Sequence, residues 1–338
     1  MGALHAGNVG DMRTDAEVLA LIQYLADMPN LYSRPYLAHA LSCLAKRPGF
    51  QPAVGDAALQ ALSTLLQQSV LESASASLAR AAVPALNGLM QSTSCVASGL
   101  LAAFAMVLLV SIPEVQLAIA EAGLPGVIHL LQGTGRPAGQ ALAANVLAIS
   151  AGNVKARAHI AQTALPALVT VLRTCPANST IVLAGIMTTL DAALCALSLL
   201  TFTFNLRASV ADAALGALVS IIQDSKQPTS DCRIYAVCVL EHLSGHWGLQ
   251  QRIADAALPG LLKLMQGSST PEERLKAVEA VSSLALCWNA QLRHQIQAAA
   301  HADLVLLARQ KMDSKSRKAA RRALRRLRHS QLSCWGIW

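Results

Sequence analysis

The stretch AEAGLPGVIHLLQ runs from Ala120 to Gln132, and a closely similar stretch, AQTALPALVTVLR, runs from Ala161 to Arg173, 41 residues later. Each copy places a proline near its start and then leucine, isoleucine or valine at helical spacing. Proline is tolerated in the first turn of a helix because its missing N–H has no helical partner there. The two copies therefore predict an amphipathic helix that recurs along the chain.

Aligning the rest of the chain on the position of Pro125 and Pro166 reveals further copies. Successive anchor positions are separated by 41, 24, 41, 41, 50, 43 and 43 residues, and the short interval indicates a missing helix between Gln68 and Arg80. The anchors are Leu19, Gln60, Pro84, Pro125, Pro166, Gly216, Pro259 and Ala302.

Each period contains the same parts. The anchor helix is followed by a polar break such as GTGRPAG or GSSTPEE, then by a second helix such as RLKAVEAVSSLAL, and then by a short helix. None of these helices can bury its apolar stripe alone, so neighbouring copies must share one core. The short helix carries an aliphatic residue six positions before the next anchor: Ile119, Ile160, Val210, Ile253 and Ile296.

The period and the phrase I-x-x-A-G/A-L-P-x-L-V-x-L-L resemble the armadillo repeat family, including its plant and algal members. The resemblance implies an all-α, right-handed superhelical solenoid of armadillo/HEAT-like repeats, with about seven to eight three-helix units over residues 14–310. It also implies a concave groove that holds extended partner segments. We expect an N-terminal tail at 1–13, a basic C-terminal helix at 311–329 that caps the last repeat, and a tryptophan-containing tail at 330–338.

On this reading, the anchor helix lines the groove and exposes the fourth and seventh residues after the anchor. Most of the seventh positions are glutamine, whose amide both donates and accepts hydrogen bonds and could hold a peptide backbone. The alternative is that glutamine is simply a soluble residue in a last helical turn. The predicted groove surface consists of His129, Gln132, Thr170, Arg173, Ser220, Gln223, Lys263 and Gln266.

Armadillo nuclear-import receptors carry tryptophan and asparagine at matched positions of the second helix. Here the asparagine positions read Ala148, Leu199, His242 and Ser283, and the tryptophan position is never tryptophan. An import-receptor function is therefore not expected from the resemblance. The groove is also far less basic than that of β-catenin-like proteins.

The net charge of +8 comes from one C-terminal stretch, because residues 311–329 carry nine Lys and Arg and one acid. The segment SKSRKAARRALRRLRH has an apolar stripe at Ala320, Ala323, Leu324 and Leu327, which predicts a helix that caps the last core. The dense positive charge is also compatible with a nuclear localisation signal, nucleic-acid binding or attachment to an anionic membrane. The basic patch comprises Arg317, Lys318, Arg321, Arg322, Arg325, Arg326 and Arg328.

The sequence shows no motif of a catalytic site or cofactor site. Cys238, His242 and His246 have helical spacing, but a buried thiol with surface histidines explains them more simply than a metal site. Recurring acids, such as Asp212 and Asp255, lie a whole repeat apart and cannot converge on one substrate. We expect no enzyme activity, cofactor, metal or small-molecule substrate.

The scattered cysteines and the lack of a secretory signal predict a cytoplasmic or nuclear location. Two apolar stretches compete with this reading as membrane spans. Residues 96–112 are short of a bilayer core, and residues 180–205 contain Asp191.

The sequence predicts a non-catalytic scaffold or adaptor that binds an extended segment of another protein. The alternatives are nucleic-acid or anionic-membrane binding through the basic helix, and a substrate-recognition arm in a ubiquitin-ligase pathway.

Overall fold

The computed structural model describes residues 113–133, 137–175, 187–223, 230–266, 270–286, 289–309 and 314–332, with scattered positions between 83 and 110. The predictions for residues 1–82 and for the tail at 333–338 lie outside the described residues.

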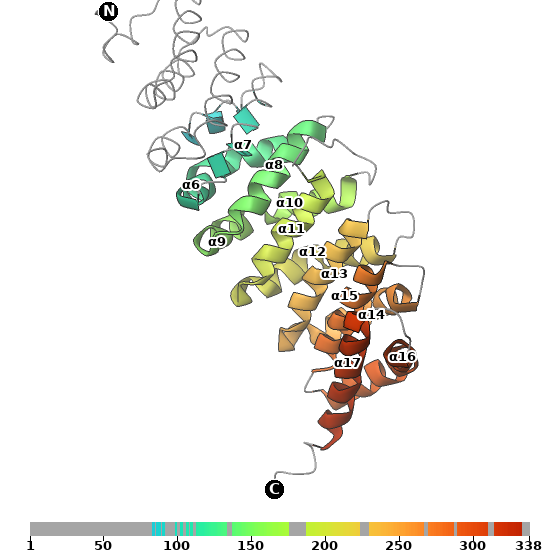
Figure 1. Ribbon diagram of the computed structural model, residues 1–338. Helices are drawn as coiled ribbons and strands as arrows, with labels where there is room; N and C mark the ends of the chain where they lie inside the picture. Colours follow the sequence, from blue (N-terminus) through green and yellow to red (C-terminus); the bar gives the residue numbers. More distant parts are fainter. Residues whose placement is uncertain are drawn as a thin grey trace, which may run out of the picture. The chain divides into compact units, whose positions relative to one another are not determined.

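Every regular element in this described part of the chain is helical (Figure 1). The predicted all-α fold is thereby confirmed. The elements are α6 (Pro113–Ala118), η4 (Ile119–Gly123), α7 (Leu124–Gln132), α8 (Pro137–Ser150), α9 (Val154–Thr163), α10 (Leu165–Thr174), α11 (Thr189–Thr201), η5 (Phe204–Leu206), α12 (Arg207–Gln223), α13 (Ser230–Ser244), η6 (Trp247–Leu249), α14 (Gln250–Gln266), α15 (Pro271–Leu284), α16 (Ala290–Arg309) and α17 (Ser314–Leu332).

The expected three-helix unit is modified in the C-terminal repeats. The short helix and the anchor helix are separate as α9 and α10, but they are fused into one helix in α12, α14 and α16. In α12 and α16 the anchors are Gly216 and Ala302, which keep their backbone N–H groups, so the helical hydrogen bonds can run through the anchor. The helix α14 continues through Pro259 and tolerates the missing donor.

The chain folds into two compact units. The boundary between them crosses α10 after Leu168 and α11 after Ala192. Unit 1 contains α6 to α9 and the start of α10, together with the start of α11. Unit 2 contains the remainder of α10 and α11 and all of α12 to α17. The boundaries expected at residues 13, 310 and 329 stay predictions, and α17 itself extends from Ser314 to Leu332.

The core of the units uses the residues that the repeat predicts. The aliphatic position before each anchor is completely buried at all five predicted sites, which are Ile119, Ile160, Val210, Ile253 and Ile296. Burying one such side chain contributes about 1.5–3 kcal/mol, so this register is strongly specified.

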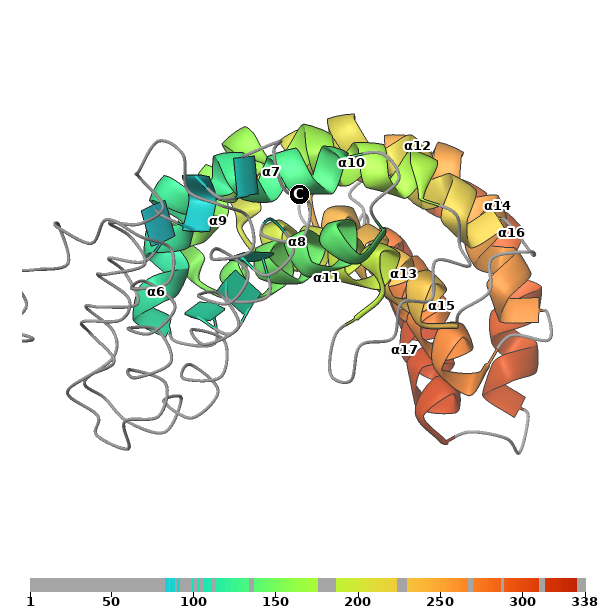
Figure 2. The same ribbon diagram turned by 90° about the horizontal axis from the view of Figure 1, so that it is seen from above.

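Unit 2 has two helix layers. The helices α12, α14 and α16 pack against one another in one layer, and α13, α15 and α17 do so in the other (Figure 2). The second layer is in more extensive mutual contact than the first. In a curved stack of two layers the helices on the inner side lie closer together, so α13, α15 and α17 form the inner layer of unit 2 and α12, α14 and α16 the outer layer.

Helix α17 covers the end of unit 2 by packing on α15 and α16. The predicted apolar stripe is confirmed at Ala320, Ala323 and Leu327, which are buried, whereas Leu324 is half-buried. The helix thus buries its apolar stripe, while most of its charged side chains are exposed. Its role as a cap of the last repeat stays a prediction.

Two helical stretches, Val115–Gln132 and Phe204–Gln223, are long and apolar enough to cross a membrane by length and composition alone, and about half of each is buried among its neighbours. The competing span at 180–205 is shorter than expected, because α11 begins at Thr189 and ends at Thr201. Asp191 in this helix accepts a hydrogen bond from Thr188.

Candidate partner-binding surface

The eight predicted groove residues are all exposed. In unit 2, however, α12 and α14 belong to the outer layer, so Ser220, Gln223, Lys263 and Gln266 do not face the inner side. The expected orientation of the anchor helix is therefore wrong in unit 2. The physical reason is that the second helices pack more closely and take the inner side. The binding role of the eight residues stays a prediction.

Several of these residues link neighbouring repeats. Arg173 donates from Nη2 to the carbonyl of Ala213 at 3.5 Å, and Lys263 donates from Nζ to the carbonyl of Gln223 at 3.1 Å. Gln266 donates from its amide to Asp303 at 2.6 Å. These polar side chains therefore stabilise the stacking of the outer layer.

The inner face of unit 2 is built by the exposed sides of α11, α13, α15 and α17. Positions three or four residues apart on each helix lie on one side of it, and the positions on this side are half-buried or exposed. They present a thiol and an aliphatic group at one end, carboxylates in the middle and guanidinium groups at the other end. We call the following set the inner-face ladder: Cys195, Leu199, Cys238, Glu241, Lys276, Glu279, Ser283, Arg322 and Arg326.

A charge cluster occupies the middle of the ladder. Lys276 Nζ lies 2.9 Å from a carboxylate oxygen of Glu279 and 3.9 Å from one of Glu241. Burial raises the pKa of the Glu241 carboxyl, against the opposing effect of Lys276. Burial alone would lower the pKa of Lys276, but its hydrogen bond to Glu279 and the nearby negative charges leave that pKa raised. The cluster holds two carboxylates against one ammonium group.

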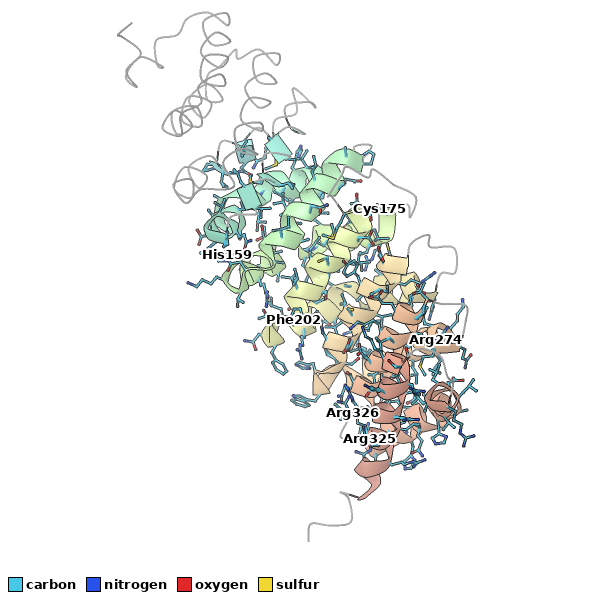
Figure 3. All side chains as sticks on the ribbon, viewed as in Figure 1. His159, Cys175, Phe202, Arg274, Arg325 and Arg326 are labelled. Carbon is cyan, nitrogen blue, oxygen red and sulfur yellow. The ribbon has the colours of Figure 1, made fainter. Side chains whose placement is uncertain are left out.

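The C-terminal end of the ladder is cationic. Arg326 on α17 donates from Nη1 to the hydroxyl of Ser282 at 2.8 Å and to the carbonyl of Ser282 at 3.2 Å. This contact fixes one guanidinium beside α15, while the neighbouring Arg325 is exposed (Figure 3).

The predicted basic patch is present on α17. Lys318, Arg321, Arg322, Arg325 and Arg328 are exposed, and Arg317 and Arg326 are half-buried. Among the ion pairs of the described residues, none includes a cation of this patch. The exposed cations of this patch attract an anionic partner.

The described residues contain no group of three His, Cys, Asp or Glu side chains placed to hold a metal ion. Helix α13 ends at Ser244, so His246 is not part of the same helical face as Cys238 and His242. The His242 ring instead contacts Phe202, with ring centroids 4.4 Å apart, and its Nδ1 lies 3.0 Å from the hydroxyl of Thr201.

One group of exposed aromatic residues was not predicted from the sequence. Phe202, Phe204 and Trp247 are at least half-exposed, and they follow the ends of α11 and α13. The repeat alignment contained a signal for two of them, since Phe204 and Trp247 each stand six residues before a buried aliphatic residue, at Val210 and Ile253.

Comparison with known proteins identifies the fold. A designed armadillo repeat protein, YIII(Dq)4CqI, aligns with a TM-score of 0.62 and 20% identity over 72% of this chain and 99% of its own. A second design, solved in complex with the peptide (KR)4, aligns with a TM-score of 0.63 and 19% identity over 72% of this chain and 99% of its own. A third protein, computationally designed for modular peptide recognition, aligns with a TM-score of 0.56 and 18% identity over 78% of this chain and 99% of its own.

The fold is an armadillo-type α-solenoid. Identities of about 20% show the fold alone. No protein-family model matches the sequence, and no curated protein does.

Proposed function

We propose that this protein is a non-catalytic scaffold that binds an extended segment of another protein along the inner face of unit 2. The observation that carries the proposal is the inner-face ladder, whose side chains are accessible and whose charge changes sign between α15 and α17. One designed protein of this fold was solved in complex with a peptide and another was designed for peptide recognition, which supports an interaction role for this chain.

The ladder implies a charge order in its partner. Helices in contact are about 8–10 Å apart, and an extended chain advances about 3.3 Å per residue. About three residues of a bound segment would then pass each repeat. We infer that the segment carries a basic residue beside Glu241 and Glu279 and an acidic residue about three positions away, beside Arg322.

Peptide selection tests this proposal directly. Binding peptides would be selected from a random 12-residue library on two proteins, the whole protein and a charge-swapped variant. The variant carries Glu279→Arg and Arg322→Glu. We expect the protein to select peptides in which a basic residue and an acidic residue are about three positions apart. The charge-swapped variant should select the reverse order. Selection of the same peptides by both proteins would contradict the proposal.

The predicted groove surface supplies a matched comparison. The triple variant Gln132→Ala, Gln223→Ala and Gln266→Ala changes exposed amides of the predicted groove surface. We expect it to leave the affinity for a selected peptide unchanged. A loss of affinity in this variant, with unchanged binding in the charge-swapped protein, would instead assign binding to the originally predicted residues.

A second function, binding of an anionic polymer through α17, is favoured by the five exposed cations of the basic patch. A protein that neutralises six phosphates shows a slope of about −5 in a plot of log K against log salt concentration. Retention on heparin should decrease when Arg321, Arg325 and Arg328 are changed to glutamine. These residues are exposed, so the fold should be retained. Unchanged elution would remove this second function.

A further inference from the structure

Unit 2 exposes a cluster of rings at the edge where its second helices end. Phe202 is 56% exposed, Phe204 is 50% exposed and Trp247 is 75% exposed. Figure 3 shows Phe202 at this edge, at the end of α11. Grouped apolar surface of this kind marks an interaction site more often than scattered single residues do. We call the following set the aromatic edge: Phe202, Phe204, Arg207, His242, His246 and Trp247.

The rings of the aromatic edge are held in place by one another. The His246 ring is stacked on Phe204 with centroids 4.7 Å apart and lies nearly parallel to the Trp247 ring at 6.3 Å. Phe202 and His242 form a separate, tilted pair with ring centroids 4.4 Å apart. The exposed faces are therefore ordered before any partner binds, which lowers the entropic cost of binding.

Arg207 fixes the base of this cluster. Its guanidinium carbon lies 5.4 Å from the centroid of the Phe204 ring, and its Nε donates to the carbonyl of Thr201 at 2.8 Å. The charged group in contact with these rings is thus already bonded to the backbone. The accessible part of the edge is mainly apolar ring surface.

The spacing of the rings selects an occupant. Phe204 and Trp247 hold the same position in successive repeats. Both rings lie beside the His246 ring, at 4.7 Å and 6.3 Å between centroids, so the Phe204 and Trp247 centroids are at most about 11 Å apart. One turn of a polyproline II helix contains three residues and advances about 9 Å. A proline-rich segment in this conformation could therefore place one proline ring beside Phe204 and the proline ring of the next turn beside Trp247.

We propose that the aromatic edge binds a proline-rich segment of a partner protein in the polyproline II conformation. Aromatic surfaces recognise such segments because the segment is already ordered and its proline rings pack flat on aromatic faces. A single-stranded nucleic acid would also stack on exposed rings, but it needs a series of cations along its phosphates. The edge offers the one guanidinium of Arg207, so the proline-rich segment is favoured.

A labelled decaproline peptide, with a labelled ten-residue glycine–serine peptide as the control, tests the proposal on the whole protein by fluorescence anisotropy. We expect decaproline to bind at least 10-fold more tightly than the control peptide. Trp247→Ala and Phe204→Ala should each raise its Kd about 10-fold, because aromatic contacts dominate such interfaces.

Two exposed apolar residues away from the edge provide matched controls. Val154 is 66% exposed at the equivalent repeat position in unit 1, and Leu306 is 57% exposed on α16. Val154→Ala and Leu306→Ala should leave the Kd for decaproline unchanged. Circular dichroism should show equal helix content in all four variants, so a loss of binding cannot come from unfolding.

Three results would overturn the proposal: equal binding of the two peptides, full binding by a Trp247→Ala/Phe204→Ala double variant, or displacement of decaproline by an oligothymidine that binds more tightly and depends on the same two rings. The proposal is independent of the inner-face function. The charge-swapped variant at Glu279 and Arg322 should bind decaproline normally, so the two proposals fail separately.

Discussion

On the outer layer of unit 2, Lys263 donates a hydrogen bond to the preceding repeat and Gln266 donates one to the next repeat. On the inner layer, Glu241, Lys276 and Glu279 form a cluster with an excess of negative charge, beside the cations of α17. Both layers expose polar residues at helical spacing. The comparison shows that exposure alone does not separate residues that hold the repeats together from residues that remain able to bind a partner.

The largest predicted effect compares a buried link between repeats with an exposed one. Arg233 lies 2.6 Å from Glu273, whose side chain is fully buried and also caps α15 through Thr270. Arg233→Ala should lower the free energy of unfolding by about 3–5 kcal/mol, because it leaves a buried carboxylate without its charge partner. Urea denaturation measures this change.

The exposed link is the control for this prediction. Arg252 pairs with Asp212 across the same sequence separation, but both side chains are largely exposed. Arg252→Ala should cost only about 0–1 kcal/mol, because water screens the pair. Equal losses for the two variants would show that the buried link has no special importance.

A second prediction concerns glycines in equivalent helices. A Cβ on Gly126 would lie 2.7 Å from the backbone oxygen of Asn87, whereas a Cβ on Gly216 would meet nothing within 4 Å. Gly126→Ala should destabilise the protein by about 1–3 kcal/mol through overpacking. Gly216→Ala should stabilise it by about 0.5–1 kcal/mol, since alanine is the better helix former. Thermal denaturation that shifts in the same direction for both variants would contradict the observed packing.

A third prediction sharpens the contrast between the layers. Gln266→Ala removes the exposed hydrogen bond to Asp303 and should cost about 0.5–1.5 kcal/mol of stability, with no change in the affinity for a selected peptide. Glu279→Gln should weaken peptide binding more than it changes stability. Urea denaturation and peptide titration of both variants check this pattern, and the opposite pattern would exchange the roles of the two layers.

The smallest effect concerns pH. Burial lowers the pKa of the His242 imidazole, and the charges of Arg207 and Lys276 add to this effect. The unfolded chain therefore takes up a proton at this residue more readily than the folded protein does. As the pH falls below about 6.5, this difference reduces the free energy of unfolding. His242→Gln should show a smaller decrease in urea midpoint between pH 7.5 and pH 5.5, and an unchanged decrease would exclude the residue as its source.

The repeat pattern predicted the helices, their order and the buried aliphatic positions, because a helix that must share its core leaves a regular apolar signal. The pattern did not predict which layer faces inward. An exposed residue such as Ser220 looks the same in sequence on either side of a stack, and the curvature depends on how closely the second helices pack. The exposure of Trp247 could not be predicted from the sequence either, because an apolar side chain ordinarily indicates a buried position.

Native thiols allow the most direct test of where a partner binds. Cys195 and Cys238 are half-exposed on the inner-face ladder, and Cys175 is half-exposed at the end of α10. Alkylation rates at these three residues would be measured by mass spectrometry with and without a saturating selected peptide. We predict at least 5-fold slower alkylation of Cys195 and Cys238 and an unchanged rate at Cys175. Protection of Cys175, with unchanged rates at Cys195 and Cys238, would contradict binding along the inner face.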